Sequence, residues 1–230
     1  MVDVAFAVSW SGGKDSCLAL HKALGCGYKV KCLLNFVSRG TKRGCFHGIE
    51  TRLMQAQARA IGIPLVQKEV SPDMNAYEQE FKSAVSELKE QGIKGMVFGD
   101  IYLDEHKQWV ERVCFEIGII PLEPLWNLPA EDVLREFIDL GYKAVVVSAK
   151  EDIPLNEFVG KVLDKDILNE LKRRNICPCG ENGEFHTFVV DGPLFQKRIK
   201  IRESEPVLKE GFWKHWFLDI KQFGEEDSML

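Results

Sequence analysis

The sequence predicts an α/β protein with a parallel sheet covered by helices on both faces, followed by a small C-terminal α+β domain. Runs rich in Val, Leu and Ile alternate with amphipathic stretches through the first 150 residues, which is typical of such a sheet. A glycine-rich turn directly follows the first run, and the alternation stops after Ala149. We therefore expect one domain over residues 1–150 and a second over 151–230.

The strands of the first domain follow from the apolar runs, which lie near 2–8, 29–37, 64–70, 95–99, 119–122 and 143–148. Between them, apolar residues recur at helical spacing, as in Ile49, Leu53, Ala56 and Ala60, and again in Tyr77, Phe81, Ala84, Val85 and Leu88. We interpret both stripes as core. After residue 150 the chain becomes mainly helical and then enters a polar, glycine-containing cluster, which predicts the mixed second domain.

Composition limits the class of protein. The chain has 230 residues and a net charge of −5, which argues against a broad nucleic-acid footprint. Seven cysteines, an odd number, lie mostly in apolar segments, which favours reduced thiols in a cytoplasmic protein. No apolar run approaches the ~18 residues of a membrane span. We expect a cytoplasmic protein with no membrane partner, and a homo-oligomer stays open.

The glycine-rich turn joins the apolar run 4–8 to a helix and is called the phosphate turn below. The first turn of a helix carries unpaired N–H groups and the positive end of the dipole, which together stabilise an anion. Glycines allow the backbone to approach closely. We predict that phosphate is held by all six residues of the turn, Ser11, Gly12, Gly13, Lys14, Asp15 and Ser16. The alternative is a glycine turn that binds nothing.

Asp15 is the unexpected member of the turn, because a carboxylate repels phosphate. It suits the site either as the N-cap of the helix or as a ligand of Mg²⁺. The common phosphate loop of kinases and GTPases does not fit, because Val8 stands where its first glycine should be and Asp15 where its Ser or Thr should be. The sequence excludes that class of nucleotide site.

Other candidates follow from the rule that ligands bind beyond the carboxyl ends of parallel strands. The rule selects Asn35, the basic loop 39–47 with His47, and the Gly99-Asp100 pair. The loop is either a lid that neutralises phosphate or a solvated loop without a role. Gly99-Asp100 either approaches a nucleotide or forms a plain turn.

A second cluster, residues 177–187, gathers acidic and polar groups around two glycines. Glu181 and Glu184 suit a cation, a substrate amine or proton transfer, and His186 and Thr187 could orient a substrate. Cys177, Cys179 and His186 also suggest zinc. We favour a turn with two reduced thiols, because C-x-C is an unusual ligand spacing and a fourth ligand is not evident.

With both clusters in view, the chain resembles known families. The phosphate turn is similar to that of the PP-loop ATP pyrophosphatases, which cleave ATP between the α and β phosphates. Gly180 to Phe185, followed by 191–195, resembles the diphthine ammonia ligase family within that group. The resemblance covers nearly the whole chain. It implies a Rossmann-like, HUP-type sheet, with an ATP-binding PP-loop domain over 1–150 and an acceptor-binding domain over 151–230.

The resemblance implies a ligase that adenylates the diphthine carboxylate of elongation factor 2, amidates it with ammonium, and releases AMP and pyrophosphate. ATP and Mg²⁺ would be the cofactors, with Asp15 the metal ligand. The catalytic residues would be Lys14, Asp15, Glu181 and Glu184. The nucleotide would be bound by Ser11, Gly12, Gly13, Lys14, Asp15, Ser16, Asn35, His47, Gly99 and Asp100. The acceptor would be bound by Asn182, Gly183, His186 and Thr187.

Two further expectations concern this chain. Lys107 and its neighbours stand where the family suggests more arginine, which puts a phosphate contact from that helix in doubt. Most of the chain is already accounted for and position 2 is Val, not an N-terminal Cys nucleophile, so we expect free ammonium, not glutamine, to supply the nitrogen.

Two other functions stay open. A PP-loop enzyme that modifies tRNA would use Arg198, Lys200 and Arg202, which alternate with isoleucines and predict a strand with one basic face. A solvated strand face is the alternative interpretation of that pattern. A sensor that binds ATP without chemistry is also compatible with the fold.

Overall fold

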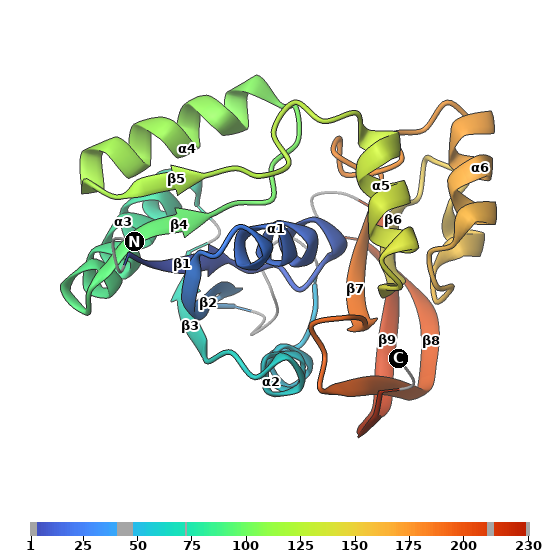
Figure 1. The fold of residues 1–230 in the computed structure, drawn as a ribbon. Coiled ribbons are helices and arrows are strands. Elements are labelled where there is room, and N and C mark those ends of the chain that lie inside the picture. Colours follow the sequence, from blue (N-terminus) through green and yellow to red (C-terminus); the bar gives the residue numbers. More distant parts are fainter. Residues whose placement is uncertain (1–3, 41–47, 72, 211–213, 229–230) are drawn as a thin grey trace.

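The computed structural model describes residues 4–40, 48–71, 73–210 and 214–228. The first sheet has five parallel strands in the order β3-β2-β1-β4-β5 (Figure 1). Its strands are β1 (Ala5–Ser9), β2 (Lys29–Ser38), β3 (Leu65–Val70), β4 (Ile93–Val97) and β5 (Ile120–Leu122). The strand order reverses at β1, so a ligand site is expected beyond the carboxyl ends of β1 and β4.

Helices cover both faces of this sheet. They are α1 (Lys14–Gly25), α2 (Thr51–Ile61), α3 (Met74–Glu90) and α4 (Asp104–Ile117). Phe6 and Val8 of β1 pack in the same core as α1 and α2. Ala5 and Ala7, on the opposite face of β1, pack with α3 and α4. β1 is thus buried on both faces, as a central strand of a parallel sheet should be, and the predicted α/β class is confirmed.

The second sheet is antiparallel, with the order β7-β6-β9-β8. Its strands are β6 (Lys143–Lys150), β7 (Phe185–Asp191), β8 (Lys197–Glu210) and β9 (Lys214–Asp227). The helices of this part are α5 (Ala130–Asp139), the short 3-10 helix η1 (Asn156–Phe158) and α6 (Lys165–Arg173). No helix in the described ranges has the length and apolar character needed to cross a membrane.

One prediction about the sheets is wrong. The strand expected at 143–148 forms, but as β6 it lies in the antiparallel sheet between β7 and β9. Residues 144–149 are buried without interruption, because β6 is central in its own sheet. A continuous apolar run therefore indicates a buried strand without indicating which sheet it joins. The predicted domain boundary after residue 150 would separate β6 from the other strands of its sheet.

Candidate active site

The phosphate turn connects β1 to α1 at the carboxyl edge of the first sheet. Gly13 is the N-cap of α1, and its N–H donates to Ser11 Oγ at 3.2 Å. Ser16 Oγ donates to the Gly13 carbonyl at 3.1 Å. Gly12 has a φ of +78°, and a Cβ built there would lie 2.8 Å from Met54 Sδ of α2. The left-handed backbone therefore favours glycine at position 12, and any larger residue would also have to displace the Met54 side chain.

Asp15 lies in the first turn of α1 and is not its N-cap, because that position is occupied by Gly13. The N-cap alternative is thus wrong. Asp15 Oδ2 pairs with Lys14 Nζ at 2.8 Å. Its other oxygen, Oδ1, is buried and has no hydrogen-bond partner among the described residues. A buried carboxylate oxygen without a partner is costly, which makes Oδ1 a candidate ligand atom.

Lys14 points from the phosphate turn into the second cluster. It is 3 % exposed, and its ammonium donates to the Cys179 carbonyl and lies 5.4 Å from the centre of the Phe185 ring. Burial lowers the pKa of Lys14, but the nearby acidic groups Asp15, Cys179 and Glu181 together outweigh it, so the pKa is raised. The side chain therefore stays an ammonium and links the two clusters that the sequence singled out.

Strand β7 extends the contact between the clusters. The Val189 N–H donates to the Gly12 carbonyl at 2.9 Å, and the Lys14 N–H donates to Thr187 Oγ1 at 3.1 Å. Thr187 is 2 % exposed. Sequence reasoning assigned Thr187 to the acceptor, whereas the structure places its hydroxyl on the backbone of the phosphate turn.

The glycines of the second cluster form a tight turn that Glu184 closes. Gly180 and Gly183 have φ values of +69° and +75°. The buried Glu184 carboxylate accepts from the N–H of Asn182 at 2.9 Å and from its side-chain amide at 3.0 Å. Lys150 Nζ donates to the Asn182 carbonyl at 2.7 Å. Glu184 thus shapes the turn, and Asn182 and Gly183 form its tip.

Glu181 differs from Glu184 in its surroundings. It is half-buried, and burial raises the pKa of Glu181 to about 7, with a further rise from the Asp15 and Asp100 carboxylates that Lys14 and His106 partly offset. A carboxyl group with that pKa can take up and release a proton at neutral pH.

Gly99 and Asp100 follow β4 and lie at the same edge. A Cβ on Gly99 would be 2.8 Å from the backbone carbon of Asp15, so Gly99 allows β4 to approach the first turn of α1. Asp100 Oδ1 is 3.1 Å from His106 Nδ1 at the start of α4. The structure therefore brings Gly99 against the phosphate turn, with Asp100 next to it in the chain.

The other residues predicted for the site are Asn35, His186 and His47. Asn35 is buried within β2, where its amide donates to the Trp10 carbonyl at 2.8 Å and accepts from Gln67 at 3.1 Å. His186 is half-buried on β7 opposite Ser148 of β6. His47 lies outside the described residues, as does the loop from 41 to 47.

The zinc alternative gains no support. The Cys177 sulfur accepts from the Tyr102 hydroxyl at 3.2 Å, and the Cys179 thiol donates to the Ala130 carbonyl at 3.2 Å. Burial raises the pKa of Cys179, which opposes the thiolate that zinc requires. In the described part of the chain, no group of three or more His, Cys, Asp or Glu is arranged to hold a metal ion.

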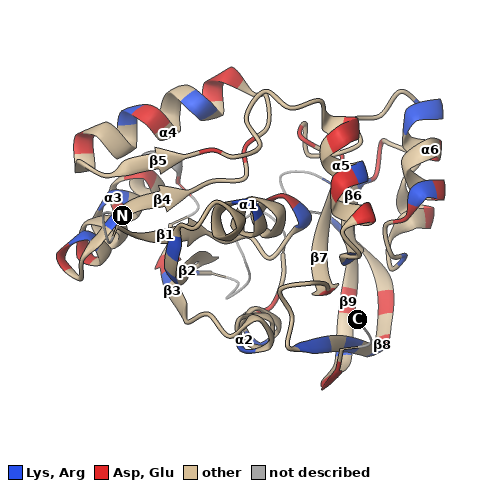
Figure 2. Ribbon diagram, viewed as in Figure 1, with Lys and Arg blue, Asp and Glu red and all other residues tan. Residues whose placement is uncertain are grey.

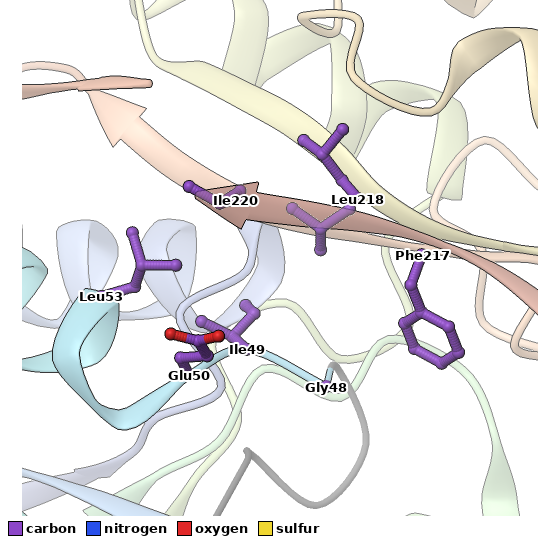
Figure 3. A pocket seen from close by; sticks show the side chains of 8 residues that line it. Gly48, Ile49, Glu50, Leu53, Phe217, Leu218 and Ile220 are labelled. Atoms are coloured by element: carbon purple, nitrogen blue, oxygen red, sulfur yellow. The ribbon is translucent and has the colours of Figure 1, made fainter. Parts of the chain in front are cut away.

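A small recess lies apart from these groups, between the start of α2 and β9 (Figure 3). Its interior has room for about one water molecule. Its lining is Gly48, Ile49, Glu50, Leu53, Val147, Phe217, Leu218 and Ile220. Glu50, the one ionisable group of that lining, pairs with Arg52 at 2.6 Å. Apart from Glu50 the lining is apolar or glycine, which does not suit binding of phosphate.

Sequence reasoning missed two residues at this edge. Glu123 directly follows β5, and its Oε1 is buried without a hydrogen-bond partner among the described residues; burial and then Asp100 raise the pKa of Glu123 to about 7. The strand-end rule that selected Gly99 could have found it. Gln57 is fully buried under the phosphate turn. The sequence could have indicated it, because Gln57 is a polar residue midway between Leu53 and Ile61 on an otherwise apolar helix face.

Comparison with known protein families accounts for both parts of the chain. The sequence model described as Diphthamide synthase N-terminal domain matches residues 4–121. The model described as Diphthamide synthase C-terminal domain matches residues 129–225. The chain belongs to the diphthamide synthase family. This membership confirms the family predicted from the two clusters.

Members of the diphthamide synthase family that resemble this chain include proteins named diphthine–ammonia ligase. The Homo sapiens protein is 28% identical over 221 residues, which cover 86% of this chain and 83% of that protein. The Danio rerio protein is 27% identical over 242 aligned positions, and the alignment covers 95% of each protein. The Schizosaccharomyces pombe protein is 27% identical over 218 residues, which cover 86% of this chain but 36% of that protein.

Proposed function

We propose that this protein is a diphthine–ammonia ligase. It adenylates the diphthine carboxylate of elongation factor 2 with ATP and amidates it with ammonium, giving diphthamide, AMP and pyrophosphate. Membership of the diphthamide synthase family supports this activity. The observation that carries the mechanism is the position of Lys14, whose ammonium lies between the phosphate turn and the second cluster.

In the first step, a carboxylate oxygen of the acceptor attacks the α-phosphorus of ATP, and pyrophosphate leaves with the electrons of the broken P–O bond. The phosphate turn binds the pyrophosphate portion, and the Lys14 ammonium stabilises its negative charge. Mg²⁺ prefers oxygen ligands and phosphates. Asp15, whose Oδ1 is buried and unpartnered among the described residues, would hold the ion, which neutralises phosphate charge when bound.

In the second step, ammonium loses one proton and the nitrogen lone pair attacks the acyl carbon; AMP departs and the nitrogen gives up a second proton to water. Glu181 is the proton acceptor in this proposal, because a pKa of about 7 makes its carboxylate a stronger base than an ordinary one and still leaves about half of the group as carboxylate at pH 7. Glu184 holds the turn that carries Glu181. Asn182, Gly183 and His186 are proposed to contact the acceptor.

The proposal assigns ATP to the first sheet and the acceptor to the second. Because β6 belongs to the second sheet, we place the division between the two parts near the start of α5, ahead of residue 150. We propose a cytoplasmic location for this protein, because the proposed acceptor is elongation factor 2. A homo-oligomer is compatible with the proposal.

A protein acceptor is favoured over tRNA by the charges on β8. Arg198, Lys200 and Arg202 lie 2.9, 3.6 and 3.4 Å from the carboxylate of Glu226 on β9. Figure 2 shows this basic start of β8 close to the acidic end of β9. The basic face is therefore partly neutralised within the sheet, which weakens it as a track for a nucleic-acid backbone.

The activity is tested by incubating the purified protein with Mg-ATP, ammonium and elongation factor 2 that carries diphthine. We expect AMP, not ADP, together with a carboxylate-to-amide mass change in the factor. Turnover supported by glutamine but not by ammonium would contradict the proposed nitrogen source. ATP bound without turnover would favour the sensor alternative.

Thr187 offers a matched pair of variants. Thr187→Val removes the hydroxyl that accepts from the Lys14 N–H, leaving a buried donor unpaired. Thr187→Ser keeps it. We expect Thr187→Val to weaken ATP binding by about tenfold, which corresponds to about 1.4 kcal/mol, and Thr187→Ser to bind ATP within a factor of about two of the wild type. Calorimetric titration with ATP checks this, and equal affinities for both variants would contradict it.

A further inference from the structure

We infer that Gln57 positions the phosphate turn by tying the Gly12 carbonyl to strand β7, so that the ATP site depends on the second sheet for its geometry. The inference rests on the proposed function only in taking the turn as the ATP site. Gln57 belongs to α2 and touches no candidate reacting group, so it acts through Gly12.

Three hydrogen bonds use the whole amide of Gln57. Its Oε1 accepts from Trp10 Nε1 at 2.9 Å. Its Nε2 donates to the Gly12 carbonyl at 2.9 Å and to the Val189 carbonyl at 2.7 Å. Gln57 is 0 % exposed. These hydrogen bonds hold the Gln57 side chain in one orientation, because rotation of the buried amide would leave polar atoms without hydrogen-bond partners.

The tie joins three segments that are distant in the sequence. Trp10 and Gly12 flank the start of the phosphate turn, α2 contributes Gln57, and β7 contributes Val189. The Val189 N–H also donates to the Gly12 carbonyl at 2.9 Å, so this oxygen receives two donors. A Cβ at Gly12 would lie 2.9 Å from Gln57 Oε1, which shows how closely the turn rests on the amide.

The position of the phosphate turn matters for function, because phosphoryl transfer depends on accurate placement of the reacting groups. Positioning errors of about 1 Å can lower an enzymatic rate by about 10²-fold. The turn's glycines have no side chains to hold their backbone, and Gln57 supplies that restraint from outside. A shift of β7, which continues from the second cluster, would move Gly12 through Gln57 and Val189.

Two substitutions at one position test the tie. Gln57→Leu removes all three hydrogen bonds, and Gln57→Glu keeps an acceptor for Trp10 but places carboxylate oxygen against two carbonyls. We expect both to raise the Kd for ATP at least about tenfold, with the KM for ammonium unchanged. The control is Ile61→Ala, which loosens the packing of the same helix without breaking a hydrogen bond to the turn.

Nucleotide binding is measured by calorimetry on variants whose circular dichroism matches the wild type. If either folded Gln57 variant binds ATP as Ile61→Ala does, the inference is wrong. If neither variant folds, amide resonances of the wild type decide it: ATP should shift the Gln57 side-chain and Val189 signals together with those of Gly12, and unshifted Gln57 and Val189 signals would overturn it. Failure of the wild type to amidate, with ATP binding intact, would contradict the proposed function and leave this inference standing.

Discussion

Glu181→Gln is expected to lower the rate of amide formation by about 10²- to 10⁴-fold, the usual contribution of a general base, while adenylation of the carboxylate continues. Glutamine keeps the size of the side chain but cannot accept a proton from ammonium. Adenylation is measured as exchange of labelled pyrophosphate into ATP without ammonium, and amidation by mass spectrometry of the acceptor.

The pH dependence of amidation also tests the role of Glu181 as proton acceptor. The pKa of Glu181 is raised to about 7, first by burial and then by Asp15, so the carboxylate form is lost as the pH falls below about 7. Amidation should therefore fall about tenfold per pH unit below 7 in the wild type and lose this dependence in Glu181→Gln. The rate is measured at saturating ammonium, and hydroxylamine, which is neutral at pH 7 and needs no proton removed before it attacks, should show a weaker dependence on Glu181.

Glu151→Gln is the matched control, because Glu151 is an exposed carboxylate just after β6. We expect both reactions of this variant to match the wild type. Equal loss of adenylation and amidation in Glu181→Gln would contradict a role confined to the second step.

Lys14→Met is expected to lower adenylation by about 10²- to 10³-fold, the loss seen when one fixed charge-stabilising group is removed from an active site. The same change removes the ammonium from the Cys179 carbonyl and leaves Asp15 without its ion-pair partner. Breaking a buried pair from one side costs roughly 3 kcal/mol of unfolding free energy. Pyrophosphate exchange and urea unfolding measure the two effects.

Lys22→Met provides the comparison within the same helix. Lys22 lies in the last turn of α1 and pairs with Glu136 at 2.6 Å on the surface. Its removal should cost less than about 1 kcal/mol and leave adenylation unchanged. A Lys14→Met protein that is destabilised but adenylates normally would show that Lys14 is only a structural tie.

The strands of the first sheet could be predicted because each is a short apolar run with a helix stripe on either side. β6 was found as a strand but assigned to the wrong sheet, because Ala144 to Val147 would be buried equally in either. Pairing partners that lie 38 residues apart, as Ser148 and His186 do, leave no local signal in one sequence.

The candidate site could be predicted where function depends on local composition. The glycines and charges of the phosphate turn and of residues 180–184 are adjacent in sequence, so each cluster was visible alone. The contact between the two clusters could not be predicted, because the hydrogen bond from Lys14 to the Cys179 carbonyl joins residues 165 positions apart. Gln57 could not be predicted for the same reason, since its partners are Trp10 and Gly12, just after β1, and Val189 on β7.

The formation of an acyl adenylate is the central claim, and oxygen-18 tests it most directly. Elongation factor 2 with oxygen-18 in the diphthine carboxylate is incubated with Mg-ATP, ammonium and the enzyme, and the AMP is analysed by mass spectrometry. Attack by the carboxylate on the α-phosphorus predicts one oxygen-18 atom in each AMP formed. Amidation with unlabelled AMP, or with ADP and labelled inorganic phosphate, would contradict the account.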